Sequence, residues 1–378
     1  MTGRSIRYRL IILLGLTLAA CLDPYPAPVS GTDAQLLVVD AEINSTDSTA
    51  RVQLSRSIGL NETRVYPRVT TAFVSIEASD GETISLTQVS EGIYTAKQYF
   101  NRDQTYRLLI SDQNVSYASD PITLVRNTPF DSVVWTADDE RLEINVNSHD
   151  DAPGPKYYRY DFEETHEYRS FFSSDWTIEN NVAVYRTPEQ NITNCWITKP
   201  SSRILLTTTE GQNQNVVSNY NIMRVSKGDR RLWHKYSLLV RQVPLDKAAF
   251  EYWTKVSQVS ESLGGLFDPI PYNIQGNIHV VSGDADNVLG YFSGGDISTR
   301  RVTIPNNQLP ANYYGVLNTA CREGYVSVNR LSSLQGRGAI ITRADYFGIF
   351  IIGYFYSTPP CVDCTLEGGE NIEPDFMK

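Results

Sequence analysis

Short runs of alternating apolar and polar residues dominate the chain over residues 35–126. Turn signals such as Ser79-Asp80-Gly81 separate the runs, which occur at 52–54, 72–76, 84–86 and 105–110. Because side chains alternate between the two faces of a strand, such runs predict half-buried strands joined by tight turns. About seven strands of this kind predict an immunoglobulin-like or transthyretin-like β-sandwich. A module of this kind spaces or presents other domains, so we expect no catalytic role for it.

The following region, residues 127–378, contains longer strand patterns. In residues 157–169 aromatic and charged residues alternate, which predicts a strand whose face with Asp161 and Glu163 lies in solvent. Residues 346–356 are the most apolar run, and we interpret them as a central buried strand because they are too few to span a membrane as a helix. Further strands are expected at 203–209, 236–241, 276–281 and 340–342. The fold class is therefore mainly β, with this larger antiparallel β-rich domain following the sandwich.

One packed α-helix is expected in the second domain, near residues 245–261. Val243-Pro244 precedes it, Gly264-Gly265 follows it, and apolar residues recur between them at helical spacing. Its aromatic residues Phe250, Tyr252 and Trp253 are interpreted as core residues packed on the sheet rather than as a ligand-stacking site.

The N-terminus has the pattern of an export signal. Arg4, Arg7 and Arg9 precede an apolar run at 10–18, and Leu18-Ala19-Ala20-Cys21 follows. The apolar run is shorter than the roughly 17–25 residues of a membrane-spanning helix. The pattern is typical of a lipoprotein signal peptide, residues 1–20, with acyl chains such as palmitate attached to Cys21. The alternative is an ordinary signal peptide with an incidental cysteine.

The segment after the signal peptide, residues 21–34, is predicted to be a lipid anchor followed by a tether. Its three prolines disfavour both helix and strand pairing, so an extended or disordered connection is expected. The lipid bilayer is thus one partner, reached through acylated Cys21. Leu22 does not give the inner-membrane retention signal that Asp gives in enterobacteria, and we expect an outer-membrane location. The choice between the periplasmic and the cell-surface face stays open, as do the oligomeric state and the ligand.

Four further cysteines remain in the mature chain, namely Cys195, Cys321, Cys361 and Cys364. An even number of cysteines in an exported protein predicts two disulfide bonds, with three possible connectivities. Cys361 and Cys364 also have the spacing of a redox site or half a zinc site, but no second Cys-x-x-Cys accompanies them. Free thiols are the remaining alternative.

Charge argues against nucleic acid as a partner. Removal of residues 1–20 takes away three arginines and no acid, which changes the formal net charge from −10 to −13. A surface this acidic repels phosphate backbones.

Motifs that would indicate catalysis are missing from the sequence. It contains no zinc-protease helix motif, no phosphate-binding glycine loop and no Gly-x-Ser-x-Gly elbow. Two weak cation sites were considered, one at His149-Asp150-Asp151 and one at Glu164 with His166. A solvated loop and a strand face are the simpler interpretations of these residues. We therefore expect a protein that is not an enzyme and has no cofactor, metal or catalytic residue, while its ligand-binding residues stay unknown.

Several motifs resemble those of a known family. These are the lipobox, Asn194-Cys195-Trp196, Ile274-Gln275-Gly276-Asn277-Ile278, Val288-Leu289-Gly290-Tyr291-Phe292, and the tail from Cys361 to Phe376. Together they resemble a family of Bacteroidota outer-membrane lipoproteins defined by domain of unknown function 4249. The family ends in a Lys-Pro-x-Phe-Trp-like sequence, whereas this chain has Glu373-Pro374-Asp375-Phe376-Met377. Family genes lie beside TonB-dependent receptors, so the resemblance implies such a receptor as partner and an accessory role in uptake.

Two functions from different classes follow. The first is a non-enzymatic outer-membrane lipoprotein that assists a TonB-dependent receptor in nutrient or ligand uptake. The alternative is a stand-alone cell-surface lipoprotein that binds glycans or peptides on exposed Tyr and Trp side chains. An open cleft rich in aromatic residues would favour the alternative, and aromatic residues buried in cores would favour the first. An unrecognised secreted hydrolase is a more distant third.

Overall fold

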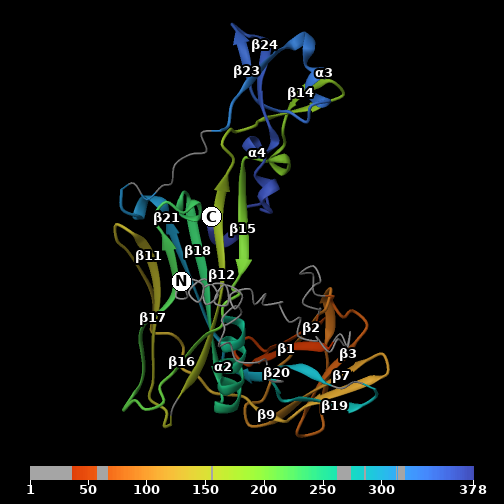
Figure 1. Ribbon diagram of the computed structural model, residues 1–378, viewed down its shortest axis with the longest axis vertical. Helices are drawn as coiled ribbons and strands as arrows, with labels where there is room; N and C mark the ends of the chain where they lie inside the picture. The colour runs from red at the N-terminus through yellow and green to blue at the C-terminus, as the bar shows by residue number, and fades with distance from the viewer. Residues whose placement is uncertain are drawn as a thin grey trace, which may run out of the picture.

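The computed structural model describes residues 36–57, 67–154, 156–261, 274–284, 287–311, 313 and 320–378. These residues form a mainly β structure of several antiparallel sheets and few helices, as the sequence predicts. Figure 1 shows three bodies: a first sandwich at the lower right, an upright second sandwich, and a distal module at the top. Cys21 and the predicted signal peptide and tether lie outside the described residues. Among the described residues, no helix combines the length and the apolarity that a membrane crossing requires.

The first sandwich packs two sheets face to face around one apolar core. One sheet has the strand order β20-β1-β2-β6-β5, and the other has the order β19-β8-β7-β3-β4 with β9 beside β7. Residues alternate in burial along β1, where Leu37, Val39, Ala41 and Ile43 point inward. The strands are β1 (Leu37–Asn44), β2 (Thr49–Arg56), β3 (Phe73–Ala78), β4 (Thr83–Ser85), β5 (Thr87–Ser90), β6 (Ile93–Lys97), β7 (Thr105–Asp112), β8 (Val115–Ser119), β9 (Ile122–Thr123), β19 (Ile278–Ser282) and β20 (Val288–Gly295).

Two strands of the first sandwich come from the region that we assigned to the second domain. β20 pairs in parallel with β1, and β19 pairs antiparallel with β8. The buried side chain of Asn277 fixes this return, since it donates to the Phe292 carbonyl and accepts from the Phe292 N–H, both at 2.8 Å. Gly276 allows the close approach, because a Cβ there would lie 1.7 Å from the Gly290 carbonyl oxygen. Two motifs of the family resemblance thus meet here and have a structural role.

The second sandwich packs a three-stranded sheet, β10-β11-β17, against a longer sheet, β15-β12-β18-β21, with β16 also paired to β12. The predicted strand at 157–169 agrees with β12 and places Tyr158, Tyr160 and Phe162 in the core. The strands are β10 (Ser132–Ala137), β11 (Arg141–Asp150), β12 (Tyr157–Arg169), β15 (Asn194–Pro200), β16 (Leu205–Thr208), β17 (Asn215–Ser226), β18 (Lys235–Leu245) and β21 (Ser298–Pro305). Two 3-10 turns, η2 (Arg230–Leu232) and η3 (Asn306–Gln308), flank β18 and β21.

Helix α2 (Lys247–Glu261) lies where the two sandwiches meet (Figure 1). It begins two residues later than predicted, because Val243 and Pro244 belong to β18. Asp246 starts it, with its carboxylate accepting from the Ala249 N–H at 2.7 Å. Tyr252 and Ala249 are buried against Tyr291 of β20, so the prediction of core packing holds for this face of the helix.

The distal module comprises residues 170–193 and 320–367. Its main sheet has the order β22-β24-β23, and the hairpin of β13 and β14 packs beside it through Trp176. Its elements are β13 (Trp176–Glu179), β14 (Val182–Tyr185), η1 (Pro188–Gln190), β22 (Gly324–Ser327), η4 (Val328–Arg330), α3 (Ser332–Gln335), β23 (Ile340–Phe347), β24 (Phe350–Ser357), α4 (Pro359–Val362) and η5 (Cys364–Glu367).

The most apolar predicted strand, residues 346–356, lies in this module. The structure splits this run, since Tyr346 and Phe347 end β23 and a turn at Gly348 and Ile349 leads into β24. The β24 part is central, because it is flanked by β22 and β23. The prediction of burial is wrong for the first part of the run, because Tyr346, Phe350 and Ile352 are exposed. The reason is its position: the β23–β24 hairpin ends the module, and in the described part of the chain no element packs over its apex.

Two disulfide bonds join the distal module to itself and to the second sandwich. Cys321 bonds to Cys361 within the module, and Cys195 of β15 bonds to Cys364. Cys361 and Cys364 therefore have different partners, and they do not form a Cys-x-x-Cys redox pair.

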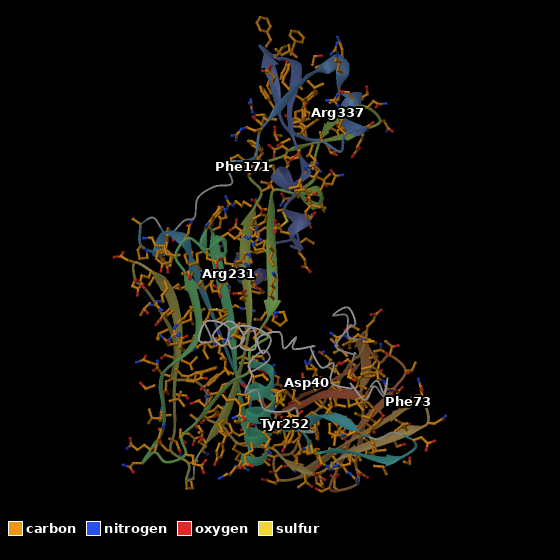
Figure 2. All side chains as sticks on the ribbon, viewed as in Figure 1. Asp40, Phe73, Phe171, Arg231, Tyr252 and Arg337 are labelled. Atoms are coloured by element: carbon orange, nitrogen blue, oxygen red, sulfur yellow. A yellow bond between two sulfur atoms is a disulfide. The ribbon has the colours of Figure 1, made fainter. Side chains whose placement is uncertain are left out.

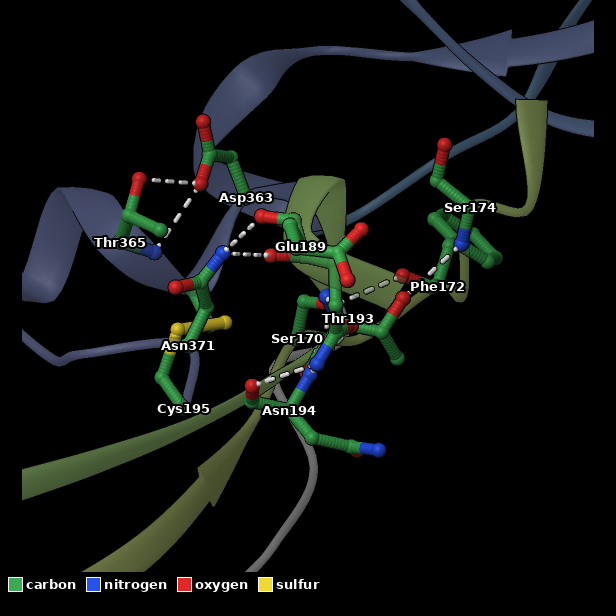
Figure 3. Close-up of a disulfide and its surroundings, with 12 residues drawn as sticks. Ser170, Phe172, Ser174, Glu189, Thr193, Asn194, Cys195, Asp363, Thr365 and Asn371 are labelled. Atoms are coloured by element: carbon green, nitrogen blue, oxygen red, sulfur yellow. Dashed lines mark hydrogen bonds between the residues drawn. A yellow bond between two sulfur atoms is a disulfide. The ribbon is translucent and has the colours of Figure 1, made fainter. Parts of the chain in front are cut away.

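The C-terminal tail then runs back along the second sandwich. Figure 3 shows Asn371 beside the Cys195 disulfide, where its amide donates to the carbonyls of Glu189 and Asn191 at 2.8 and 2.9 Å. In the last turn, η6 (Asp375–Met377), Met377 is fully buried and Phe376 lies under the guanidinium of Arg301 at 3.6 Å. The tail is thus an ordered part of the second sandwich.

Candidate functional site

A cleft of about 500 Å³ opens where the outer faces of the two sandwiches oppose each other. Alternation along β1 and β2 turns Asp40, Glu42 and Arg51 away from the first core. The same alternation along β12 and β18 turns Arg159, Asp161 and Arg241 away from the second core. The full lining is Asp40, Glu42, Arg51, Gln53, Arg159, Asp161, Phe162, Glu163, Pro200, Ser201, Ser202, Arg203, Ile204, Leu239, Arg241 and Trp253. Figure 2 shows Asp40 and Tyr252 at this junction.

Ion pairs cross the cleft and join the two sandwiches. Glu42 of the first sandwich accepts from Arg241 of the second and lies 3.8 Å from the guanidinium of Arg159. Asp161 pairs with the same two arginines, at 3.0 Å from Arg159 and 3.6 Å from Arg241. This shared network fixes how the outer faces of the sandwiches meet.

The surroundings of the cleft raise the pKa values of Asp40 and Arg159. Burial raises the pKa of Asp40, and the positive charge of Arg159 only partly opposes this rise. Half of the Asp40 side chain is still exposed, so its carboxyl lies in a concavity that water enters. Burial alone would lower the pKa of Arg159, but Asp161, Asp40 and Glu42 raise it above its ordinary value. The arginine therefore stays charged although only 7% of the residue is exposed.

Trp253 forms one wall of the cleft from helix α2. The guanidinium of Arg159 stacks over its ring, 4.4 Å from the centroid. The Nε atom of Arg159 and the indole Nε1 of Trp253 are both buried without a hydrogen-bond partner. Buried donors are normally paired, so these two N–H groups are free to bind an acceptor once a side-chain rearrangement uncovers them.

The lining has four carboxylates and four guanidinium groups. Such a balanced set favours neutral or zwitterionic polar ligands over strongly charged ones, because each added charge would meet a like charge nearby. The geometry can bind and orient a ligand through hydrogen bonds and contact with Trp253. Clefts at domain junctions are frequent ligand sites.

A larger cavity, about 650 Å³, lies between loops at one end of the second sandwich. It contains the His149-Asp150-Asp151 segment that we considered for a metal. Its polar groups satisfy one another: His149 lies 2.7 Å from Asp131, and Asn215 donates to the carbonyls of Ala152 and Gly154. We therefore prefer the junction cleft, which presents unpaired donors.

The second considered cation site, Glu164 with His166, is occupied by protein groups. Glu164 accepts from Arg231 at 2.9 Å and from the Tyr236 hydroxyl at 3.0 Å. Burial, together with Arg231, lowers the pKa of His166 to about 4. An adjacent guanidinium repels a metal ion. Over the described residues, no group of three or more His, Cys, Asp or Glu side chains has a metal-binding arrangement.

Sequence reasoning missed the residues of the cleft. Asp161 and Glu163 were interpreted as solvent-facing, and both are instead half-buried in the cleft wall. Trp253 was interpreted as core, and it is partly buried with one part lining the cleft. The sequence does contain a signal, because Asp40 and Glu42 alternate with apolar residues, as Arg159 and Asp161 do. This local alternation does not indicate that the two charged strand faces lie opposite each other.

A family model described as "Domain of unknown function (DUF4249)" matches residues 22–301. The match covers the first sandwich, the second sandwich as far as the middle of β21, and every cleft residue, and it ends before most of the distal module. No curated protein matches the chain.

Proposed function

Since the chain belongs to the family of the domain of unknown function DUF4249, whose description gives no activity, we propose a function from the geometry. The protein is a non-enzymatic outer-membrane lipoprotein that captures a polar ligand in the junction cleft and assists a TonB-dependent receptor in its uptake. The single observation that carries the proposal is the charge-balanced cleft with its unpaired donors between the two sandwiches. The lipobox at Cys21 and the motif resemblance to Bacteroidota lipoproteins support the membrane and the receptor.

The placement of aromatic residues favours this function over a stand-alone glycan- or peptide-binding protein. Among the described residues, eleven tyrosines are buried in cores, including Tyr106, Tyr160 and Tyr236. The cleft wall contains two aromatic residues, Phe162 and Trp253, and Arg159 already covers one face of the indole. A broad aromatic platform of the kind that binds long glycans is thus missing from this cleft.

The receptor-facing surface in this proposal is the C-terminal tail. Its backbone is fixed by the Cys195–Cys364 bond and by the pairing of Glu370 with Trp196. Leu366 and Ile372 nevertheless point outward and are exposed. Rigid exposed apolar side chains are suitable anchors for a partner, because little conformational entropy is lost when they bind.

The decisive experiment is co-purification from detergent-solubilised outer membranes with the acylated full chain as bait. We expect a TonB-dependent receptor to co-purify with the wild type, and less of it with Leu366→Asp combined with Ile372→Asp. Phe73→Asp is the matched control, since Phe73 is equally apolar and exposed but lies on the first sandwich. Absence of any such receptor with the wild type would refute the accessory role.

Ligand capture is tested separately with maltose and trialanine as small probes of the neutral-sugar and zwitterionic-peptide classes. We expect calorimetry to detect one of them, and Asp40→Asn with Arg51→Gln to weaken its binding about ten-fold. Asp120→Asn, an exposed position of the first sandwich outside the cleft, is the control. Binding of a probe without any receptor in the pull-down would instead favour the stand-alone alternative.

A further inference from the structure

The apex of the β23–β24 hairpin exposes an unbroken apolar run. Phe347, Ile349 and Phe350 are 75%, 87% and 68% exposed, and Tyr346 and Ile352 are also exposed. No charged side chain lies between Asp345 and the end of β24 at Ser357. Soluble proteins seldom expose contiguous apolar groups of this size without a partner. We propose that this apex inserts into the lipid bilayer to which the predicted N-terminal anchor tethers the chain.

The turn is built to present these side chains outward. Phe347 pairs with Phe350 across the hairpin, which leaves Gly348 and Ile349 as a two-residue loop. Gly348 has φ +63°, a conformation that glycine adopts without strain and that two-residue hairpin loops require at their first position. The loop is therefore tight, and few backbone polar groups would enter the lipid with it.

The base of the hairpin is rigid. Ile341 and Tyr354 are buried with Trp176 and Leu334 in the small core of the module. The Cys321–Cys361 bond lies in a second small cluster of the module, against which Ile340 of β23 packs. A fixed apex does not fold back to bury its own apolar side chains, so an external apolar medium must cover them.

The residues next to the apolar apex resemble those that proteins place at the interface between lipid and water. Tyr346, Tyr185 and Tyr325 are exposed around the sheet, each with an apolar ring and a polar hydroxyl. Arg343 stacks over Phe355 at 3.5 Å. Residues 320–357 contain four arginines and two acids, while the whole chain has a net charge of −10. The segment that carries the hairpin is thus slightly basic, but the distal module as a whole has five arginines and seven acids, so the exposed apolar side chains and not headgroup charge carry the proposal.

The chain outside the described residues allows this contact. Fourteen residues separate Cys21 from Leu36, so fifteen steps of about 3.3 Å along an extended chain give a reach of about 50 Å. Figure 1 places β1 and the apex of the hairpin at opposite ends of the molecule. Insertion of the apex into the same leaflet therefore gives a two-point attachment, with the long axis lying along the membrane.

The first test uses the acylated full chain reconstituted in vesicles of phosphatidylethanolamine and phosphatidylglycerol. Ile349→Cys carries an environment-sensitive NBD label, and Phe73→Cys carries the same label as a matched exposed control. We expect a blue-shifted emission and quenching by spin-labelled lipids at position 349, and water-like emission at position 73. Water-like emission at both positions overturns the proposal. A label that is shielded in native outer membranes but not in these vesicles, which contain no other protein, also overturns the proposal, because that result assigns the apex to a protein partner.

The second test removes the anchor. The mature chain with Cys21→Ala, which lacks the predicted signal peptide of residues 1–20 as well as the anchor, should still float with the same vesicles. Serine at Phe347, Ile349 and Phe350 together should reduce vesicle binding at least ten-fold, whereas Phe73→Ser should not change it. All three apex positions are exposed, so the thermal unfolding midpoint should remain that of the parent. Equal binding by the triple variant overturns the proposal.

Discussion

The first sandwich and the distal module are both closed β structures, but different forces stabilise them. A single cluster of 25 buried apolar residues fills the first sandwich, which contains no cysteine. The two clusters of the distal module contain six and three buried residues, and both disulfides end in that module. A small core cannot offset the entropy of ordering its chain, so covalent links substitute for apolar burial. The comparison predicts that the two regions respond to different perturbations.

The largest effect is expected from loss of the Cys195–Cys364 bond. It closes a loop of 169 residues, which in the chain-entropy model corresponds to about 5 kcal/mol of stability. The double variant Cys195→Ser with Cys364→Ser should expose the distal module to limited proteolysis while fragments containing the first sandwich stay protected. Simultaneous digestion of both regions would contradict the comparison.

The reciprocal change is Phe292→Ala. Phe292 is fully buried in the first sandwich, so the cavity should cost about 3–5 kcal/mol. Urea unfolding should show loss of the first sandwich at lower denaturant, with both disulfides and the distal module retained. Phe73→Ala, at an exposed position of the same sandwich, should change stability by less than about 0.5 kcal/mol.

Low pH should destabilise the second sandwich, which connects these two regions, because His166 is buried there in its neutral form. Burial, with Arg231 and Arg230 nearby, lowers its pKa from 6.5 to about 4. Between pH 6.5 and 4, His166 is therefore protonated in the unfolded chain but neutral in the folded chain. The free energy of unfolding should fall by up to about 3 kcal/mol as the pH decreases from above 6.5 toward 4. His166→Gln should flatten this part of the stability profile. His279→Gln, an exposed histidine of the first sandwich, should leave the profile as in the wild type.

The smallest effect is expected at the contact between Arg230 and Glu367. The two side chains pair at 2.7 Å, and both are partly exposed. An exposed pair of this kind contributes at most about 1 kcal/mol, so Arg230→Gln should barely shift the unfolding midpoint, and high salt should remove the difference. A loss as large as that from the disulfide would mean that the tail depends on charge rather than on its covalent link.

The sequence predicted individual strands better than their partners. Alternation identified β12 over its full length, because burial on one face acts on neighbouring residues. Alternation could not show that β20 pairs with β1, because the two strands are far apart in the sequence and neither contains a pattern that identifies its partner. The junction cleft depends on that long-range pairing, so its residues were interpreted as solvated.

The disulfides show a similar limit. Cysteine count and export predicted two bonds, but each of the three connectivities was compatible with the spacing. The pairing of Cys195 with Cys364 follows from the tail returning beside β15, where Glu370 bridges to Trp196. The exposure of Phe350 was missed for a different reason, because apolarity predicts burial without saying what covers the residue.

The pairing of β1 with β20 has a consequence for the order in which the molecule is made. When residues 36–126 have been synthesised, the outer edges of β1 and β8 still lack their partners, β20 and β19. These edges stay open to wrong pairing until residue 295 has been synthesised, and contacts this distant in sequence form slowly. The N-terminal sandwich is therefore among the first parts to emerge and among the last to be completed, and chaperones have the longest time to act on it.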